Sequence, residues 1–347
     1  MKIYINGRFL TQPMTGVERY AYNICKALRD LQQPFTVVCP KAQSILSCYD
    51  VSGFQIVRYG IGSSHFWEQC ILPFFFIGKK DYTLFNFTGL GTILVRQKVM
   101  IIHDLSFLHN PKWFSASYYW WYRVMMPLAA RSSRHIITIS EFSKREILKY
   151  YPFLDENRVS VIYGAADDTL FQPHDNEEPS NVRYALAVSS LDPRKNFESL
   201  IKAFEGLNNC QLYIVGSANR VFSQRNNLQQ HSNIKFLGRV SDDELVRLYR
   251  QAACFIFPSV YEGFGLPPLE AMRCGCPVLV SDIPVLREVC QDAAIYFNPL
   301  DINDIHTAIE HFLSLKDTER AAMQERGLTH AAHFSWEQAA KAIVALS

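Results

Sequence analysis

The sequence lacks three motifs that would identify common metal or nucleotide chemistry. It contains no Asp-x-Asp pair, so the usual carboxylates that hold a divalent ion on a diphosphate are missing. It also contains no Gly-x-Gly-x-x-Gly fingerprint and no Walker-type glycine-lysine loop. The sequence therefore does not favour a nicotinamide-dependent or ATP-dependent enzyme. We also expect no metal ion to take part in the reaction.

Long apolar runs are also absent. The longest, Cys70 to Gly78, is interrupted by Pro73 and is about half the length that a membrane-spanning helix needs. The opening Met1 to Arg8 has the pattern of a short strand, without the continuous apolar core of a signal peptide. We therefore expect a cytoplasmic protein without a transmembrane anchor.

The nine cysteines form no Cys-x-x-Cys motif and no His/Cys cluster, and their number is odd. This pattern predicts free, mostly buried thiols in a reducing compartment, and it argues against a zinc site or a disulfide framework.

Length and charge indicate two unequal halves. A chain of 347 residues exceeds the usual size of a single core, so two domains are expected. Residues 1–172 carry 19 Lys and Arg against 12 Asp and Glu, and the remainder carries 16 against 21. The basic half suits an anionic surface or acceptor, although a solvated face explains a moderate excess equally well. No nucleic-acid partner is expected.

Short β-rich apolar runs alternate with longer amphipathic stretches, which is typical of parallel α/β domains. The predicted strands of the first half are Lys2 to Ile5, Phe35 to Cys39, Gln55 to Tyr59, Tyr82 to Phe85, Val99 to Ile102, His135 to Ile139 and Val159 to Ile162. Those of the second half are Tyr184 to Val188, Cys210 to Val215, Ile234 to Phe236, Cys254 to Phe257, Pro277 to Val280 and Ile295 to Phe297. Helices are predicted at Val17 to Leu31, Ser115 to Arg131, Glu141 to Tyr150 and Trp336 to Leu346. Each half then forms a doubly wound unit, with ligands expected beyond the carboxyl ends of its strands.

The segment from Gln172 to Asn181 is polar, acidic and bracketed by prolines, so it is predicted to be a linker. The expected organisation is an N-terminal Rossmann-like domain over residues 1–172, a linker over 173–181, a C-terminal Rossmann-like domain over 182–332 and a final helical segment over 333–347.

The richest stretch for chemistry runs from Pro258 to Met272. A predicted strand ends before it, a loop with two glycines follows, and a pair of prolines suits the first turn of a helix. Glycines allow a close backbone approach, and the amides of a helix N-terminus favour phosphate. Glu262 in the loop and Glu270 in the helix can accept hydrogen bonds from hydroxyls, since ionised carboxylates are strong acceptors. A first-turn acid and a solvated glutamate are the structural alternative.

Glu262 and Glu270 have a Glu-x7-Glu spacing, and this stretch closely resembles the signature of retaining GT-B glycosyltransferases of the large bacterial family four. The likeness continues through Phe236 to Leu245 and Cys274 to Val278, covers most of the second half and is weaker in the first. It implies the α/β GT-B fold, in which two Rossmann-like domains face a central cleft. The acceptor side is then the N-terminal domain, the nucleotide sugar binds the C-terminal domain, and the final helix crosses back to the N-terminal domain.

The same resemblance assigns roles in the second half. It implies that Glu262 contacts hydroxyls of the donor sugar and that Glu270 binds the ribose. The backbone amides expected to hold sugar and phosphate are those of Gly263, Phe264, Gly265 and Leu266, and the residues expected to border the base are Gly238 and Val240.

The pair Arg194-Lys195 follows a predicted strand, where fixed cations would stabilise a departing diphosphate. Lys195 matches the phosphate-binding lysine of the family, and Arg194 is typical of one subgroup. Many members have an arginine directly after this strand, where this chain has Ser189 and Ser190. A surface Arg-Lys pair that opens a helix is the alternative.

Two segments of the first half resemble family loops. Gly16 lies between the first strand and the first helix, where the family places a glycine against the donor diphosphate or the acceptor, although such a glycine can equally mark a turn. Arg19 is a further candidate. His103 and Asp104 end an apolar strand and resemble the His-Asp loop whose histidine faces the reacting sugar; a hydrogen-bonded structural histidine is the alternative.

Two stretches, Phe66 to Lys80 and Trp113 to Arg134, are rich in aromatic and basic residues. This combination suits a membrane interface with anionic lipids, but aromatic helices are also ordinary core.

We therefore expect a retaining, metal-independent hexosyltransferase that uses a nucleotide diphosphate sugar and no cofactor. GDP-mannose is the first donor to test, and the acceptor is a hydroxyl of a glycan or lipid-linked glycan, as in O-antigen or capsule assembly. Peripheral contact with the cytoplasmic face of the inner membrane is the hypothesis that follows from the aromatic, basic stretches. A non-catalytic sugar-nucleotide or glycan-binding scaffold and a sugar-nucleotide epimerase remain alternatives; an epimerase would need no acceptor.

Overall fold

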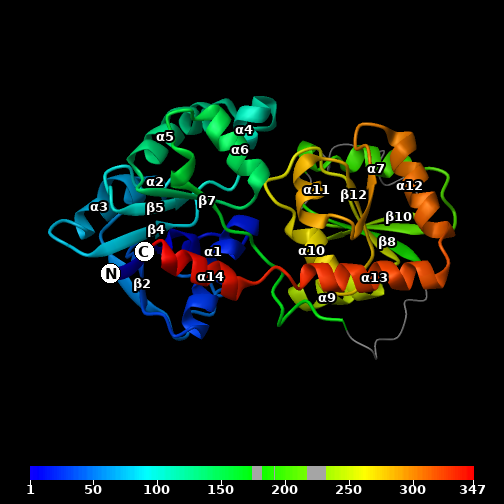
Figure 1. Cartoon of the computed structure of the whole chain (residues 1–347), viewed down its shortest axis with the longest axis horizontal. Helices are drawn as coiled ribbons and strands as arrows, with labels where there is room; N and C mark the ends of the chain where they lie inside the picture. Colours follow the sequence, from blue (N-terminus) through cyan, green and yellow to red (C-terminus); the bar gives the residue numbers. More distant parts are fainter. Residues whose placement is uncertain (174–181, 191, 217–231) are drawn as a thin grey trace. The chain divides into compact units, whose positions relative to one another are not determined.

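The structure is a computed structural model that describes residues 1–173, 182–190, 192–216 and 232–347. The chain divides into two compact units (Figure 1). Unit 1 comprises Met1–Gly164 and Ser335–Ser347, and unit 2 comprises Ala165–Phe334. Apart from Pro173, the predicted linker over 173–181 lies outside the described residues.

Unit 1 is built on a seven-stranded parallel sheet with the order β3-β2-β1-β4-β5-β6-β7. Its strands are β1 (Lys2–Asn6), β2 (Phe35–Pro40), β3 (Gln55–Tyr59), β4 (Tyr82–Asn86), β5 (Lys98–Ile101), β6 (His135–Thr138) and β7 (Val159–Val161). The chain moves outward from β1 in one direction and then returns to place β4 on the other side of β1. This order confirms the doubly wound prediction and makes the boundary between β1 and β4 the topological switch point.

Helices cover both faces of this sheet (Figure 1). They are α1 (Gly16–Asp30), α2 (Ser64–Phe66), α3 (Leu72–Phe75), α4 (Ser106–His109), α5 (Ala116–Ser132), α6 (Glu141–Tyr150) and α14 (Trp336–Ala345), with shorter turns η1 (Gly7–Thr11), η2 (Trp67–Ile71, a π-helix), η3 (Pro111–Trp113) and η4 (Glu156–Arg158). Serine residues cap α5, α6 and α14, since Ser115, Ser140 and Ser335 each accept from a backbone N–H of the first turn.

Unit 2 repeats the plan with a six-stranded parallel sheet in the order β10-β9-β8-β11-β12-β13. Its strands are β8 (Tyr184–Val188), β9 (Gln211–Val215), β10 (Ile234–Gly238), β11 (Cys254–Phe257), β12 (Val278–Ser281) and β13 (Ala294–Phe297). The described helices are α7 (Phe197–Ala203), α9 (Asp242–Gln251), α10 (Leu266–Arg273), α11 (Pro284–Cys290), α12 (Ile302–Ser314) and α13 (Asp317–Ala331), with the turn η5 (Pro193–Lys195). Its switch point lies between β8 and β11.

The central strands of both sheets are buried, as expected of parallel sheets that helices cover on both faces. All four residues of β11 are buried, and so are all five of β4. Helices α7 and α12 pack on unit 2's sheet through one continuous apolar cluster that includes Phe197, Phe204 and Phe312. Burial of this apolar area is the main driving force for the fold.

The compact units divide at Gly164, earlier than the predicted domain end at Gln172. The reason is local packing, because the ring of Phe171 lies 6.0 Å from the ring of Tyr249, and Arg250 Nε donates to the carbonyl of Gln172 at 2.7 Å. At the other end, α14 belongs to unit 1, where it packs on α1.

The described cysteines are all free thiols, and Cys48 and Cys70 are the exposed ones. Within residues 1–173, 182–190, 192–216 and 232–347, no helix combines the length and apolarity required to cross a bilayer.

Candidate active site

The two loops at the switch point of unit 2 carry three charged candidate residues. The loop after β8 holds Arg194 and Lys195, and the loop after β11 holds Glu262. Because β8 and β11 are neighbours in a parallel sheet, their carboxyl ends meet at one edge. The topology therefore brings together residues that lie 67 positions apart in the sequence.

Lys195 and Glu262 form a direct ion pair at this edge. Lys195 Nζ donates to Glu262 Oε1 at 2.6 Å, and both residues are about nine-tenths buried, with exposed fractions of 9% and 8%. Lys195 Nζ also lies 5.5 Å from the centroid of the Phe257 ring, which adds a cation–π contact. Two opposite charges so close together and so little hydrated stabilise each other, and removal of either leaves the other unpaired.

The loop that presents Lys195 has a strained but well-anchored backbone. Asp192 caps the η5 turn by accepting from Arg194 N at 3.1 Å. Asn196 follows in the left-handed region at φ 56°, which is unusual for a residue other than glycine. Its side chain is fixed at both ends, since Nδ2 donates to Pro299 O and Oδ1 accepts from Ser199, each at 2.7 Å. Strain held in this way is common at ligand sites.

Arg194 has a clear structural role in addition to its proposed one. Its backbone carbonyl accepts from Val260 N at 2.9 Å, which ties the β8 loop to the β11 loop. Its guanidinium Nε lies 3.7 Å from Asp192 Oδ1. The sequence alone predicted neither contact.

The glycine loop before α10 confirms the predicted strand-turn-helix geometry. Gly265 is the N-cap of α10 and has φ 123°, and a Cβ there would lie 2.8 Å from Leu286 Cδ2. Only glycine fits that position without strain. The side chain of Phe264 is buried, with its ring 5.9 Å from that of Phe334, so any ligand contact by Phe264 must use its backbone.

Glu270 lies inside α10 and is only 8% exposed. Tyr249 on α9 donates its hydroxyl hydrogen to Glu270 Oε2 at 3.3 Å. Burial, followed by the nearby Glu270 charge, raises the pKa of Tyr249 well above its ordinary value, so the phenol stays protonated and can donate. Sequence reasoning missed Tyr249, because an aromatic residue on a helix gives no signal that distinguishes it from core.

Gly238 and Val240 lie at the end of β10, on the edge of the sheet and two strands from β8. Gly238 has φ 70° and follows an irregularity in the pairing of β10 with β9. A Cβ at Gly238 would meet no atom within 4 Å, so the backbone conformation, and not crowding, explains the glycine.

In unit 1, His103 follows β5 and is held by the neighbouring loop. Its Nε2 lies 2.9 Å from the carbonyl of Phe87, and because a carbonyl only accepts, Nε2 must carry the proton. The ring also makes an edge contact of 5.4 Å with Tyr20. Burial lowers the pKa of His103 below its ordinary value, against the opposing effects of the Phe87 carbonyl and Asp104. His103 is therefore a neutral imidazole with an unprotonated Nδ1.

Asp104 caps the next turn, since its Oδ1 accepts from Ser106 N at 2.9 Å. Gly16 is the first residue of α1, and Glu18 and Thr15 form a capping box at that end. Gly16 is exposed, its φ is not positive, and an added Cβ would meet no atom within 4 Å. Neither backbone conformation nor packing thus requires glycine there. Arg19 lies in the first turn of the same helix.

The structure thus brings Lys195 to Glu262 and places Glu270 on the helix that follows the same loop. Gly238 and Val240 lie at the sheet edge, and Gly16, His103 and Asp104 belong to unit 1. Across the described residues, His, Cys, Asp and Glu side chains form no group of three or more that could hold a metal ion.

Two family models match the chain. The model described as Glycosyltransferase Family 4 matches residues 14–170, and that described as Glycosyl transferases group 1 matches residues 168–330. The two matches meet near the division between units 1 and 2.

Two curated relatives match over most of their length. The chain is 28% identical over 324 residues to the O-antigen chain mannosyltransferase RfbU of Salmonella typhimurium, covering 87% of this chain and 88% of the relative. It is 30% identical over 279 residues to the O-antigen chain mannosyltransferase B of Escherichia coli, covering 74% of this chain and 72% of the relative.

Solved structures agree on the fold. Sucrose-phosphate synthase from Thermosynechococcus elongatus superposes with a TM-score of 0.79 at 17% identity and covers 99% of this chain and 97% of that one. HepE from Anabaena, solved in complex with UDP and glucose, superposes with a TM-score of 0.76 at 19% identity and covers 99% and 98%. These likenesses show two parallel-sheet domains of the GT-B type.

Proposed function

Since this chain belongs to glycosyltransferase family 4, we propose that it transfers a mannosyl group from a nucleotide diphosphate sugar to a hydroxyl of a growing surface glycan. GDP-mannose is the proposed donor. The names of the matched relatives support this choice, because two of them are O-antigen chain mannosyltransferases. The proposed acceptor is a glycan or lipid-linked glycan of the O-antigen kind.

The observation that carries the proposal is the buried ion pair between Lys195 and Glu262 at the switch point of unit 2. An ammonium has three donors, so Lys195 can keep Glu262 in place and also bind an oxygen of the diphosphate. The carboxylate in turn can accept from hydroxyls of the donor sugar. One side-chain pair thus offers a binding partner for each kind of group in a nucleotide sugar, the ammonium for phosphate oxygens and the carboxylate for sugar hydroxyls.

Negative charge grows on the diphosphate as the glycosidic bond breaks, and a fixed cation stabilises that charge in the transition state. Lys195 supplies it, assisted by Arg194 and by the backbone amides of Gly263 to Leu266 at the start of α10. Glu270, held by Tyr249, accepts from the ribose hydroxyls, and Gly238 and Val240 border the base. These assignments follow the chemistry of the groups and the family resemblance.

Unit 1 supplies residues for the reacting sugar and the acceptor in this proposal. The neutral His103 offers Nδ1 as an acceptor for a sugar hydroxyl, with Nε2–H anchored on Phe87. Asp104 orients the loop, and Gly16 leaves room at the N-terminus of α1 for a phosphate or a sugar.

In this proposal the reaction retains the anomeric configuration and uses neither a metal ion nor a cofactor. Catalysis comes from positioning of the substrates and from electrostatic stabilisation of the departing diphosphate. The protein works at the cytoplasmic face of the membrane in this proposal, with peripheral contact to anionic lipid. Support for the contact comes from large apolar side chains that remain exposed, namely Phe66, Phe74, Ile77, Trp120, Trp121, Val124 and Leu128.

The test compares Lys195→Met and Glu262→Gln with the control Lys202→Met, an exposed lysine on α7. We expect kcat/KM for transfer from GDP-mannose to fall about 100-fold for Lys195→Met, as for loss of one transition-state donor, and about 10-fold for Glu262→Gln. Lys202→Met retains the wild-type rate. Product configuration is determined by NMR, and EDTA is expected to leave the rate unchanged.

Because Lys195→Met leaves a buried carboxylate unpaired, the double variant Lys195→Met/Glu262→Gln is measured beside it, and all variants are first compared by melting temperature. Folded single and double variants with full activity would refute the site assignment. Binding of GDP-mannose without any transfer to any acceptor would favour a non-catalytic scaffold, and epimerised donor without a new glycoside would favour an epimerase.

A further inference from the structure

The loop between β4 and β5 begins with the carbonyl that fixes His103. Phe87 is the first residue after β4, and its carbonyl accepts the Nε2 hydrogen of His103 at 2.9 Å. Residues 87–92 are buried except for Gly89, which is partly buried. Loops usually lie on the surface, because a buried backbone needs a partner for each of its polar groups. The residues that hold this loop therefore also hold the Phe87 carbonyl.

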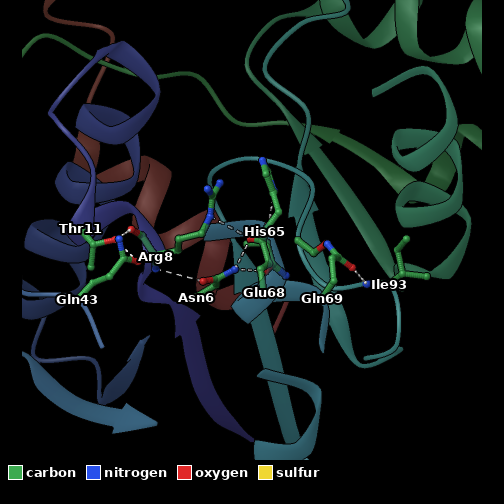
Figure 2. Close-up of polar contacts among 10 residues, drawn as sticks. Asn6, Arg8, Thr11, Gln43, His65, Glu68, Gln69 and Ile93 are labelled. Carbon is green, nitrogen blue, oxygen red and sulfur yellow. Dashed lines mark hydrogen bonds and ion pairs between the residues drawn. The ribbon is translucent and has the colours of Figure 1, made fainter. Parts of the chain in front are cut away.

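Gln69 holds the loop through both ends of its amide. Its Nε2 donates to Gly91 O at 2.6 Å, and its Oε1 accepts from Ile93 N at 3.1 Å, a contact that Figure 2 shows. One side chain thus bonds to backbone groups two residues apart, as a paired strand does. The sequence gave no sign of this role, because one glutamine in a short helical turn forms no pattern.

The turn that carries Gln69 is itself anchored on β1. The preceding residue, Glu68, is fully buried, and its Oε1 accepts from Asn6 Nδ2 at 2.7 Å and lies 3.5 Å from Arg8 Nε (Figure 2). Its Oε2 lies 3.4 Å from His65 Nδ1. This turn, η2, is a π-helix, a rare form that is frequent at functional sites. The paired charges thus fix the base from which Gln69 reaches the loop.

Two glycines allow the loop to lie close to its neighbours. Gly89 has φ 68°, and a Cβ there would lie 2.5 Å from Arg8 Nη2. Gly91 has φ 62°, and a Cβ there would lie 2.7 Å from Cγ of Asn86, the last residue of β4. Backbone conformation and space both require glycine at these positions. The conformation of the loop is therefore matched to the residues around it.

The tautomer of His103 is the property that this loop controls. The ring makes an edge contact with Tyr20, and the backbone carbonyl accepts from Ser143 Oγ at 3.2 Å, so the residue is confined. A neutral imidazole carries its proton on either nitrogen, and a hydrogen bond to one nitrogen decides which. The Phe87 carbonyl favours Nε2–H and leaves Nδ1 as an acceptor. With this carbonyl displaced, the proton would also occupy Nδ1, which would then no longer accept.

We propose that Gln69 is a positioning residue for His103. It holds residues 91 and 93, and the loop thereby keeps the Phe87 carbonyl on Nε2. Nδ1 of His103 then stays unprotonated, as the acceptor for a sugar hydroxyl. The proposal rests on the role of His103 in the glycosyl transfer proposed above, and it adds the residue that sets the tautomer.

Two variants of Gln69 and one matched control test the proposal. Gln69→Met keeps most of the side-chain volume and removes both hydrogen bonds, and Gln69→Ala removes them and leaves room for water. The control is Gln43→Met, since Gln43 is also a partly buried glutamine of unit 1 (Figure 2). Its Oε1 accepts from Thr11 Oγ1 at 3.4 Å, a residue outside the loop after β4. The melting temperatures of all variants are compared first.

The first readout is the tautomer of His103, which needs no substrate. Long-range proton–nitrogen NMR of histidine-labelled protein distinguishes Nε2–H, Nδ1–H and the charged ring, and the spectrum of His103→Ala identifies the signals of His103. We expect Nε2–H in the wild type and in Gln43→Met, and a mixture with Nδ1–H in both Gln69 variants. A purely structural role of Gln69 would lower the melting temperature and leave the tautomer unchanged.

The second readout is a double-mutant cycle in steady-state kinetics on the full chain. We expect Gln69→Met to lower kcat for transfer from GDP-mannose about 10-fold, as for loss of one hydrogen bond, and to change the KM for GDP-mannose less than about twofold. In the His103→Ala background, the same substitution should change kcat less than about twofold, because the group that it positions is absent. Gln43→Met should not change the rate in either background.

An Nδ1–H or charged His103 in the wild type would overturn the proposal, whether or not any variant folds. Nε2–H retained in the folded Gln69 variants would overturn it too, and so would an equal loss of kcat with and without His103. If the tautomer shifts as expected but no sugar is transferred from GDP-mannose, the proposed reaction fails and the positioning of His103 by Gln69 stands.

Discussion

The position of the Glu270 carboxylate depends on a neighbour that the sequence pattern does not identify. Its carboxylate is 8% exposed, and the Tyr249 hydroxyl at 3.3 Å fixes Oε2. A hydrogen bond to a charged group contributes about 1.5–3 kcal/mol, more than one between neutral groups. The orientation of the Glu270 carboxylate, for which we propose a ribose contact, is therefore expected to depend on this hydrogen bond.

We predict that Tyr249→Phe raises the KM for the nucleotide sugar about 10-fold and leaves kcat nearly unchanged, because the ribose contact is made equally in the ground state and the transition state. Steady-state kinetics with calorimetric titration of GDP measures both effects. The control is Tyr213→Phe, which also removes one hydroxyl, here one that accepts from Lys235 on the neighbouring strand. Equal donor affinity in both variants would show that Tyr249 has only a packing role.

The N-terminus of α1 is well capped, and the space beside Gly16 is empty. The capping box of Thr15 and Glu18 stabilises the helix, and Gly16 adds nothing to it that alanine could not supply. A substitution of Gly16 by alanine can therefore test the proposed functional role of this turn without loss of stability.

We predict that Gly16→Ala leaves the melting temperature unchanged or slightly raises it, while kcat/KM for transfer falls about 10-fold because the methyl group occupies space for a phosphate or sugar. Gly78→Ala is a useful comparison, since Gly78 also has open space around it but has φ 76°. This substitution should lower the stability and leave the transfer activity unchanged. Wild-type activity in a stable Gly16→Ala protein would leave this glycine without a functional role.

Most elements could be predicted from the sequence, because their apolar periodicity matches the local burial. Every predicted strand is present, with ends shifted by a residue or two, as at β5, which begins at Lys98. The apolar pattern could not place Lys98 there, since its buried Nζ donates to Val95 O, three residues earlier, and to Ser132 Oγ at the end of α5. The helical turns α2, η2 and α3 were also missed, because they are too short for a period to register.

At the scale of the whole molecule, the positive excess of residues 1–172 coincides with exposed aromatic residues on α5. Arg123 lies 5.6 and 5.8 Å from the rings of Tyr119 and Trp120. Aromatic rings with an attached cation suit the headgroup region of an anionic bilayer.

We predict that the protein co-floats with phosphatidylglycerol vesicles at low salt, and that Trp120→Ser/Trp121→Ser reduces the bound fraction several-fold, because both exposed tryptophans of α5 are lost. Raising the salt concentration should release the protein, since the attraction is screened. Leu300→Ser is the control, as Leu300 is 81% exposed but belongs to unit 2. A wild-type protein that stays with the lipid-free fraction at low salt would end the membrane proposal.

The sequence by itself determined the alternation of strands and helices, the doubly wound class, the Glu-x7-Glu segment and the candidate cations, because these depend on local periodicity and on motifs short enough to be read along the chain. Only the tertiary structure decided that Lys195 pairs with Glu262, that Tyr249 holds Glu270, and that Arg8, His65 and Glu68 meet at one sheet edge. Except for His65 and Glu68, which are three residues apart, those partners belong to different elements of a parallel α/β unit, where long connections separate neighbours in space by many residues in sequence.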